Sequence, residues 1–207
     1  MAQDRTAPLL VSRRPLTGWS IVLWSTVAVC TASSFMFTLE GGGLEGWHAV
    51  VRTSAKTSIA LFLLAFIASS ARVFWRGPFT KWLLANRRYV GLSFAASHAV
   101  HLAAILTIVA FEPGFHSSPT TVVFGSLGYV ILAAMAATSS DAAVAWLGGR
   151  AWKALHKTGM YYLWFIFLVS YLPRLLTQSP WYALFVVPLL AGIGLRFAAW
   201  QRQRRKA

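Results

Sequence analysis

Three histidines lie inside apolar stretches of this 207-residue sequence: His98 and His101 in one stretch, and His156 at the start of another. Polar side chains are expensive inside a membrane, so a histidine kept there needs a partner. His98 and His101 are one helical turn apart, and both imidazoles can therefore face the same interior space. An imidazole facing an apolar slot suits an axial ligand of an iron porphyrin, because ligation replaces the lost hydration.

A simpler interpretation of the same histidines is that they hydrogen-bond across helices. His48 and His116 lie in predicted outer loops or at span edges, where histidines are usually solvated. Acidic residues are absent from the middle of the predicted spans, so a proton or cation pathway built on carboxylates has no support. The candidate chemistry therefore rests on His98, His101 and His156.

Long apolar segments must position these histidines. Hydrophobic residues make up 57% of the chain and charged residues 12%, against the usual ~25% charged. A bilayer-crossing helix needs roughly 20 apolar residues. The composition excludes a disordered chain, a coiled coil and an ordinary soluble enzyme, and it predicts an all-α integral membrane protein built as a six-transmembrane-helix bundle. The predicted spans are Trp19–Leu39, Thr57–Trp75, Tyr89–Phe111, Thr121–Thr138, Leu155–Leu172 and Trp181–Trp200.

The basic residues predict the orientation of these spans. The net charge of +14 comes from Lys and Arg in short loops between apolar spans, so we expect contact with membrane lipid and no nucleic-acid partner. Of the 19 Lys and Arg, only Arg52, Lys56 and Arg174 fall on one side of the membrane. The positive-inside rule then places both termini in the cytoplasm. The chain divides into a cytoplasmic segment 1–18, a transmembrane domain 19–200 and a basic cytoplasmic tail 201–207.

The third predicted span carries two faces that matter for packing. Arg87, Phe94, His98 and His101 fall within one broad stripe of the helix. Beside it runs a row of small residues that predicts a close helix–helix contact: Gly91, Ala95, Ala99 and Ala103.

Two segments around the histidines follow a known pattern. One is Arg87-Arg88-Tyr89-Val90-Gly91-Leu92 followed by Val100-His101-Leu102; the other is Thr138-Ser139, Leu147-Gly148, Trp152 and Leu155-His156. They resemble the third span, and the segment leading into the fifth span, of the ferric reductase-like transmembrane domain family. The resemblance covers about residues 52–172. It is strongest to small bacterial members without a flavin domain, such as the membrane haem subunit of the periplasmic methionine sulfoxide reductase system.

The resemblance implies a bundle in the bacterial inner membrane that binds haem b. We expect an electron-transfer subunit that takes electrons from a quinol or a separate reductase and passes them to an outer-side acceptor, such as a periplasmic redox partner. The chain has no GxGxxG turn, so neither a flavin nor a quinone cofactor has motif support. The alternative is a haem-less member that acts as a structural or regulatory membrane partner. Whether the chain is itself an enzyme stays open.

The sequence leaves the set of haem ligands open. Relatives commonly carry a second histidine thirteen residues after the one at His156, and Val169 stands there, so we expect one haem at most. At ~1.5 Å per residue, His98 lies within about 6 Å of the depth of His156, and His101 about 10 Å from it. Depth therefore favours His98 with His156, whereas the resemblance favours His101 and His156. Arg87 is a further candidate, as ligand or propionate partner, because its position faces the inner haem in some relatives.

Overall fold

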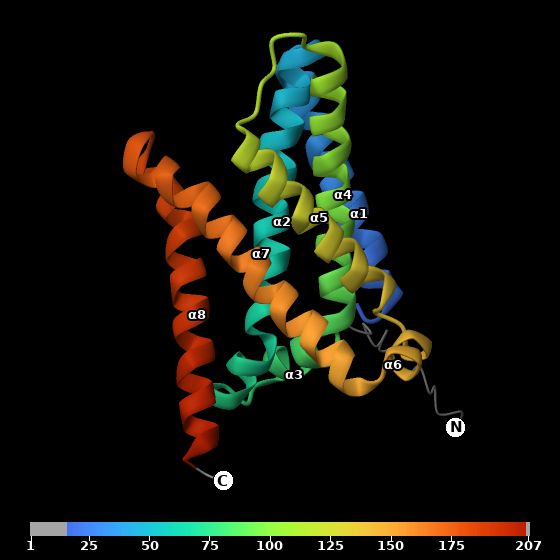
Figure 1. Cartoon of the computed structure of the whole chain (residues 1–207), viewed down its shortest axis with the longest axis vertical. Coiled ribbons are helices and arrows are strands. Elements are labelled where there is room, and N and C mark those ends of the chain that lie inside the picture. Colours follow the sequence, from blue (N-terminus) through green and yellow to red (C-terminus); the bar gives the residue numbers. More distant parts are fainter. Residues whose placement is uncertain (1–15, 206–207) are drawn as a thin grey trace, which may run out of the picture.

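Six long apolar helices build the protein, and the computed structural model describes residues 16–205 (Figure 1). Their length and composition suit membrane crossing, and no strand occurs within these residues, so the predicted all-α six-span class is confirmed. The spans are α1 (Trp19–Leu39), α2 (Gly43–Phe74), α4 (Arg87–Phe111), α5 (Pro119–Ala137), α7 (Gly149–Thr177) and α8 (Ala183–Arg204). Nearly all of the predicted segment 1–18, with Arg5, Arg13 and Arg14, lies outside the described residues.

Short helices that the hydropathy pattern did not predict connect the spans. Helix α3 (Pro78–Ala85) joins α2 to α4, α6 (Asp141–Leu147) joins α5 to α7, and the 3-10 turn η1 (Pro180–Tyr182) precedes α8. Proline at the first turn of α3 fits the helix start, where the missing N–H has no intrahelical partner to lose. Helix α8 runs to Arg204, inside the predicted tail 201–207.

The two ends of the bundle differ in charge. Helices α3 and α6 and both ends of the described chain lie together at one end, which we call the basic end (Figure 1). Lys and Arg cluster in the half of the bundle next to it: Arg72, Arg76, Lys81, Arg87, Arg88, Arg150, Lys153, Lys157, Arg196, Arg202, Arg204 and Arg205. The opposite end, which we call the acidic end, carries Glu40, Glu45 and Glu112. The charge asymmetry is thus preserved in three dimensions.

Helix α2 is the central element, with α1, α4 and α8 packed around it. Hydroxyl side chains join α2 to α4: the Ser97 Oγ lies 2.9 Å from the Ser58 Oγ and 3.1 Å from the Thr57 Oγ1. The buried residues of α4 include Ser93, Ser97 and Ala104. The predicted close-packing row was wrong in its position: Ala99 and Ala103 are exposed, and a side chain added at Gly91 would meet nothing within 4 Å. Ala95 of that row is half-buried against the core, and the small polar residue Ser97 makes the hydrogen-bonded contact with α2.

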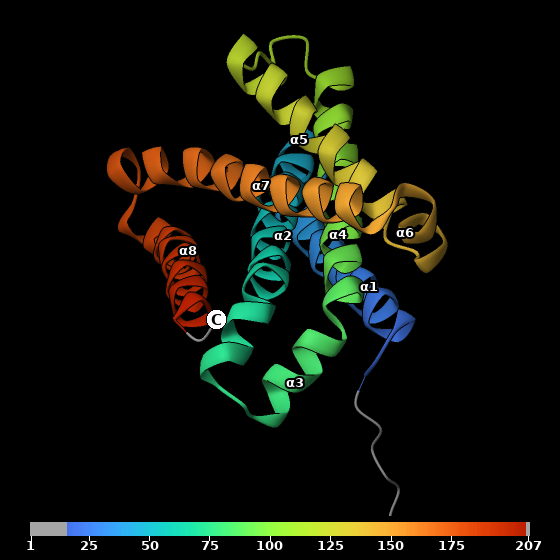
Figure 2. The same ribbon diagram turned by 60° about the horizontal axis from the view of Figure 1, so that its bottom comes forward.

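Helix α7 crosses the bundle diagonally instead of running parallel to α2 and α4 (Figures 1 and 2). It packs on α5 where Gly159 leaves room for Met135 and Ile131. Between α2, α4 and α7 the space is filled by aromatic rings. The Phe62 ring centroid lies 5.5 Å from that of Phe94 and 5.1 Å from that of Phe167. These rings form the core that separates the two sites described next.

Candidate functional site

The structure divides the four predicted site residues into two groups. His98 and His101 lie together in the interior, and we call them the histidine pair. Arg87 and His156 line a cavity near the basic end, which we call the basic pocket. Among residues 16–205, no three His, Cys, Asp or Glu side chains gather as ligands of a bare metal ion would. A haem iron takes only one or two axial side chains from the protein, so these groups remain the relevant ones.

The histidine pair is a stack of two imidazoles. The ring centroids lie 5.2 Å apart and the planes are 25° from parallel. Rings from two other helices border His98: Tyr129 of α5 at 4.9 Å and Phe167 of α7 at 5.9 Å. Because His98 and His101 project from one helix as a stack, they cannot bind a planar porphyrin from opposite faces. At most one of them is an axial ligand of a given haem.

His101 is held in one orientation by helix α2. Its Nδ1 lies 3.0 Å from the carbonyl oxygen of Val51 and 3.1 Å from the Ser54 Oγ. A carbonyl only accepts, and the Ser54 hydroxyl donates its own proton to Val50 at 2.6 Å. Nδ1 is therefore the protonated nitrogen, and Nε2 carries the lone pair. Metal-binding histidines characteristically donate their second ring N–H to a backbone carbonyl in this way.

Two polar atoms at His98 and its neighbour Tyr129 have no hydrogen-bond partner within residues 16–205. They are the Nδ1 of His98 and the hydroxyl oxygen of Tyr129, both fully buried. Buried polar groups are nearly always satisfied, so an unpaired group marks a place where a bound molecule or water is expected. The histidine pair thus combines one oriented imidazole with two unsatisfied groups.

The basic pocket lies between α2, α4, α7 and α8 and has a volume of about 250 Å³. Its lining comprises Ala65, Arg87, Trp152, Lys153, His156, Lys157, Met160 and Arg196. His156 stacks on Trp152 with 4.3 Å between ring centroids, and its Nε2 lies 3.2 Å from the Thr138 Oγ1. The Thr138 hydroxyl donates to Ala134 at 2.7 Å, so it accepts from the His156 Nε2–H. In this arrangement the Nε2 of His156 is occupied as a donor.

The predicted pairing of His98 with His156 at one depth is not formed. His98 contacts Phe167, and Phe167 follows His156 by eleven residues of α7, which is roughly 16 Å along a helix. A depth estimated from residue numbers requires parallel helices that start at the same level. Because α7 crosses diagonally, that assumption fails (Figure 2). The other predicted partner position, Val169, is 45% exposed and lies about 200° around the helix from Phe167, away from His98.

The remaining predicted polar groups form hydrogen bonds near the two ends of the bundle. His48 lies within α2 rather than in a loop, with its Nε2 2.9 Å from the Glu112 carboxylate. His116 is exposed, as predicted, and bonds its own loop at Gly114. At the basic end the Arg88 guanidinium donates to Asp141, and this hydrogen bond holds the pKa of the Asp141 carboxyl below its usual value.

Several contributors to these sites had weak sequence signals or none. Ser54 and Ser58 sit one turn apart on α2, which hints at a polar interhelical face. Tyr129 and Arg196 come from predicted spans without any motif. Their roles depend on the packing of α5 and α8, which hydropathy does not specify.

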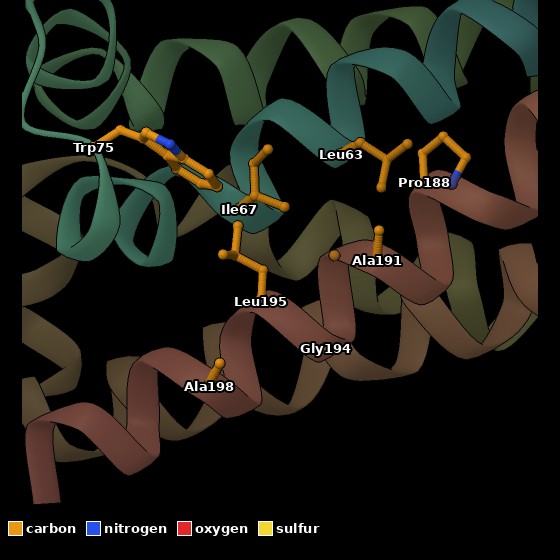
Figure 3. A pocket seen from close by; sticks show the side chains of 9 residues that line it. Leu63, Ile67, Trp75, Pro188, Ala191, Gly194, Leu195 and Ala198 are labelled. Carbon is orange, nitrogen blue, oxygen red and sulfur yellow. The ribbon is translucent and has the colours of Figure 1, made fainter. Parts of the chain in front are cut away.

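A second cavity, of about 460 Å³, opens between α2 and α8 (Figure 3). Its walls are apolar, with Leu63 and Ile67 facing Ala191 and Leu195, and Trp75 at one end. Among the described residues 16–205, no charged or titratable side chain lines it. The cavity therefore suits a hydrocarbon chain and is not a candidate catalytic site.

Comparison with known proteins adds no relative: the chain matches no protein-family model, no curated protein and no solved structure. The resemblance to the ferric reductase-like family therefore stays a prediction carried by its motifs. The site is defined by the chain's own geometry, above all by the oriented imidazole of His101.

Proposed function

We propose that the protein is a transmembrane electron-transfer subunit that binds one haem b through the histidine pair. The observation that carries this proposal is the Nδ1–H of His101, held by the Val51 carbonyl, which leaves Nε2 as a ligand nitrogen. A bound haem b would supply reversible one-electron oxidation and reduction of its iron. The electrons would come from a quinol or a separate reductase and leave to an acceptor beyond the acidic end, such as a periplasmic redox partner.

The residues around the pair have defined tasks in this proposal. Ser54 and the Val51 carbonyl fix the imidazole orientation and raise the basicity of the His101 Nε2. The His98 Nδ1 and the Tyr129 hydroxyl, which have no partner within residues 16–205, would be available to hydrogen-bond a bound haem. The rings of Phe94 and Phe167, 5.9 Å apart, exclude water and give a low dielectric that shapes the redox potential.

The positions of the histidines leave one protein side chain to bind the haem iron. His98 and His101 share one side, His156 lies far along α7, and Val169 points away. We therefore propose that His101 would hold one haem per chain, and that neither His156 nor Arg87 would bind its iron.

A second candidate function is a haem-less structural or regulatory membrane partner. It is favoured by the close ring packing of Phe62, Phe94 and Phe167, which fills the space between α4 and α7. The absorption spectrum separates the two candidates. Protein purified in detergent from cells supplied with a haem precursor should show a b-type α-band when reduced with dithionite. Colourless protein refutes the electron-transfer function and leaves the structural one.

We also propose that the basic end faces the cytoplasm of a bacterial inner membrane. The clustering of Lys and Arg at this end, against Arg52, Lys56 and Arg174 elsewhere, supports this orientation. Reporter fusions at Gly42, Ser117 and Gln178 should report the outer side, and a fusion after Ala207 the inner side. A C-terminal fusion that reports outside refutes the orientation.

A further inference from the structure

The basic pocket gathers several positively charged side chains. Arg87, Arg196, Lys153 and Lys157 line it together with His156, and no carboxylate of residues 16–205 does. Of the carboxylates among residues 16–205, Glu40, Glu45 and Glu112 belong to the acidic end, and Asp141 is paired with Arg88. Several positive charges close together near the membrane repel one another, which costs free energy unless an anion binds between them.

The two arginines differ in how they are held. Arg196 is fixed: its Nη1 donates to the Phe66 carbonyl at 2.6 Å, and its guanidinium stacks 4.4 Å from the Phe66 ring and 4.9 Å from the Tyr161 ring. Arg87 is half-buried, and within residues 16–205 it has no hydrogen-bond or ion-pair partner. A fixed positive charge beside an arginine with unused donors is a preformed anion site, since guanidinium groups bind phosphate in two-pronged fashion.

The depth of the pocket indicates what carries the anion. His156 lies seven residues into α7 and Arg196 eight residues before the end of α8, or roughly 10 to 12 Å from those helix ends. The headgroup layer of a bilayer is about 5 to 8 Å thick on each side. Because α7 is tilted (Figure 2), these lengths along the helices are upper limits on depth, and the pocket lies within reach of lipid headgroups at the basic end. The exposed Lys153 and Lys157 stand on its rim, whereas the apolar Ala65 and Met160 line its floor.

We propose that the basic pocket is a binding site for an anionic phospholipid, whose phosphate is held by Arg87 with Lys153 and Lys157 and whose glycerol region rests on Met160 and Ala65. Cation-lined pockets between helices on the cytoplasmic side are suited to such headgroups. The volume of about 250 Å³ equals that of roughly eight water molecules, which is ample for a phosphate group. This site is separate from the histidine pair and does not require a haem.

The test measures lipid binding by delipidated protein in neutral detergent. Native mass spectrometry and thermal unfolding would be followed during titration with phosphatidylglycerol, phosphatidylcholine or inorganic phosphate. We expect phosphatidylglycerol to bind and to raise the unfolding temperature, and the other two to have little effect. Equal effects of phosphatidylcholine would overturn the charge requirement. If inorganic phosphate matches phosphatidylglycerol, the site is one for free phosphate and the lipid assignment is wrong.

Two neighbouring arginines provide a matched pair of variants. Arg87→Gln should weaken phosphatidylglycerol binding about five- to tenfold, and Arg87→Lys should restore much of it. Arg88→Gln, next along the helix but paired with Asp141 outside the pocket, should bind like the unmodified protein. If Arg87→Gln and Arg88→Gln weaken phosphatidylglycerol binding equally, the binding depends on overall surface charge and the proposed site is refuted. Should Arg87→Gln fail to fold, the double variant Lys153→Gln/Lys157→Gln gives the same readout.

The haem spectrum keeps this proposal distinct from the proposed function. Arg87→Gln should retain the haem spectrum while losing lipid. The opposite result, loss of haem with lipid binding intact, would make Arg87 a propionate partner and refute the lipid site. A colourless unmodified protein that still binds phosphatidylglycerol would refute the haem proposal alone.

Discussion

Removing one hydroxyl on α2 should weaken haem binding at His101. The variant Ser54→Ala deletes the Oγ that lies 3.1 Å from the His101 Nδ1. The Val51 carbonyl, 3.0 Å from the same nitrogen, remains. The imidazole would keep its tautomer but lose one of the two contacts that fix its orientation. Its Nε2 would then be a less well-positioned ligand.

The size of the effect follows from the contact that remains. Changing a residue that orients a metal-bound histidine typically lowers metal affinity 10- to 100-fold. Because the Val51 carbonyl still accepts the proton, we expect the lower limit, about tenfold, or about 1.4 kcal/mol of haem-binding free energy. The free energy of unfolding should fall by only about 0.6 kcal/mol, the average worth of an interhelical hydrogen bond in a membrane.

Titration of the haem-free protein with haemin, followed by the Soret band, measures this change. Ser58→Ala is the matched control, since Ser58 lies one turn along α2, is equally buried and bonds Ser97 instead of His101. The control should bind haem like the unmodified protein. If Ser54→Ala and Ser58→Ala weaken binding equally, or if neither does, the assignment of His101 as the oriented ligand is refuted.

Other predictions concern packing, charge and the missing ligand. Gly159→Ala should lower the free energy of unfolding by about 1–3 kcal/mol, because its Cβ would overlap side chains of α5. Gly91→Ala is the control, since a Cβ at Gly91 would meet open space and should leave the stability unchanged. Equal unfolding temperatures of the two variants would contradict this prediction. The lowered pKa of Asp141 means that its pair with Arg88 stabilises the fold above the usual carboxyl pKa and is lost as pH falls through the lowered value. Asp141→Asn should therefore unfold at a slightly lower temperature than the unmodified protein at pH 7, and at the same temperature at low pH. A lower unfolding temperature that persists in acid would contradict this prediction. Val169→His should leave the haem-to-protein ratio unchanged, because position 169 faces outward; a second haem would show that it faces the interior.

Hydropathy was enough to predict the spans but not the connections. Predicted and observed bounds agree for Trp19–Leu39, whose ends coincide with the apolar run. Helix α2 begins at Gly43, well before the predicted Thr57, because Glu45, Arg52 and Lys56 interrupt the apolar pattern while the helix continues. At 32 residues it is roughly 48 Å long and exceeds the ~30 Å hydrocarbon layer. Helices α3 and α6 are too short to give a hydropathy signal.

The candidate site was predictable in its residues and not in their grouping. A polar side chain within an apolar segment is recognisable from residue type alone, so His98, His101 and His156 are predictable as candidate site residues. Their depths depend on helix tilt, which packing sets and sequence length does not. The partners Tyr129 and Arg196 reach the sites only through the packing of α5 and α8, so no local pattern marked them.

The haem content of two single variants tests the central claim most directly. Protein purified after growth with a haem precursor would be assayed for haem per chain and for its reduced α-band. His101→Ala should lose the bound haem, because it removes the oriented ligand nitrogen. His156→Ala should keep it, since His156 lies in the separate basic pocket. Haem retained in His101→Ala and lost in His156→Ala would contradict the account.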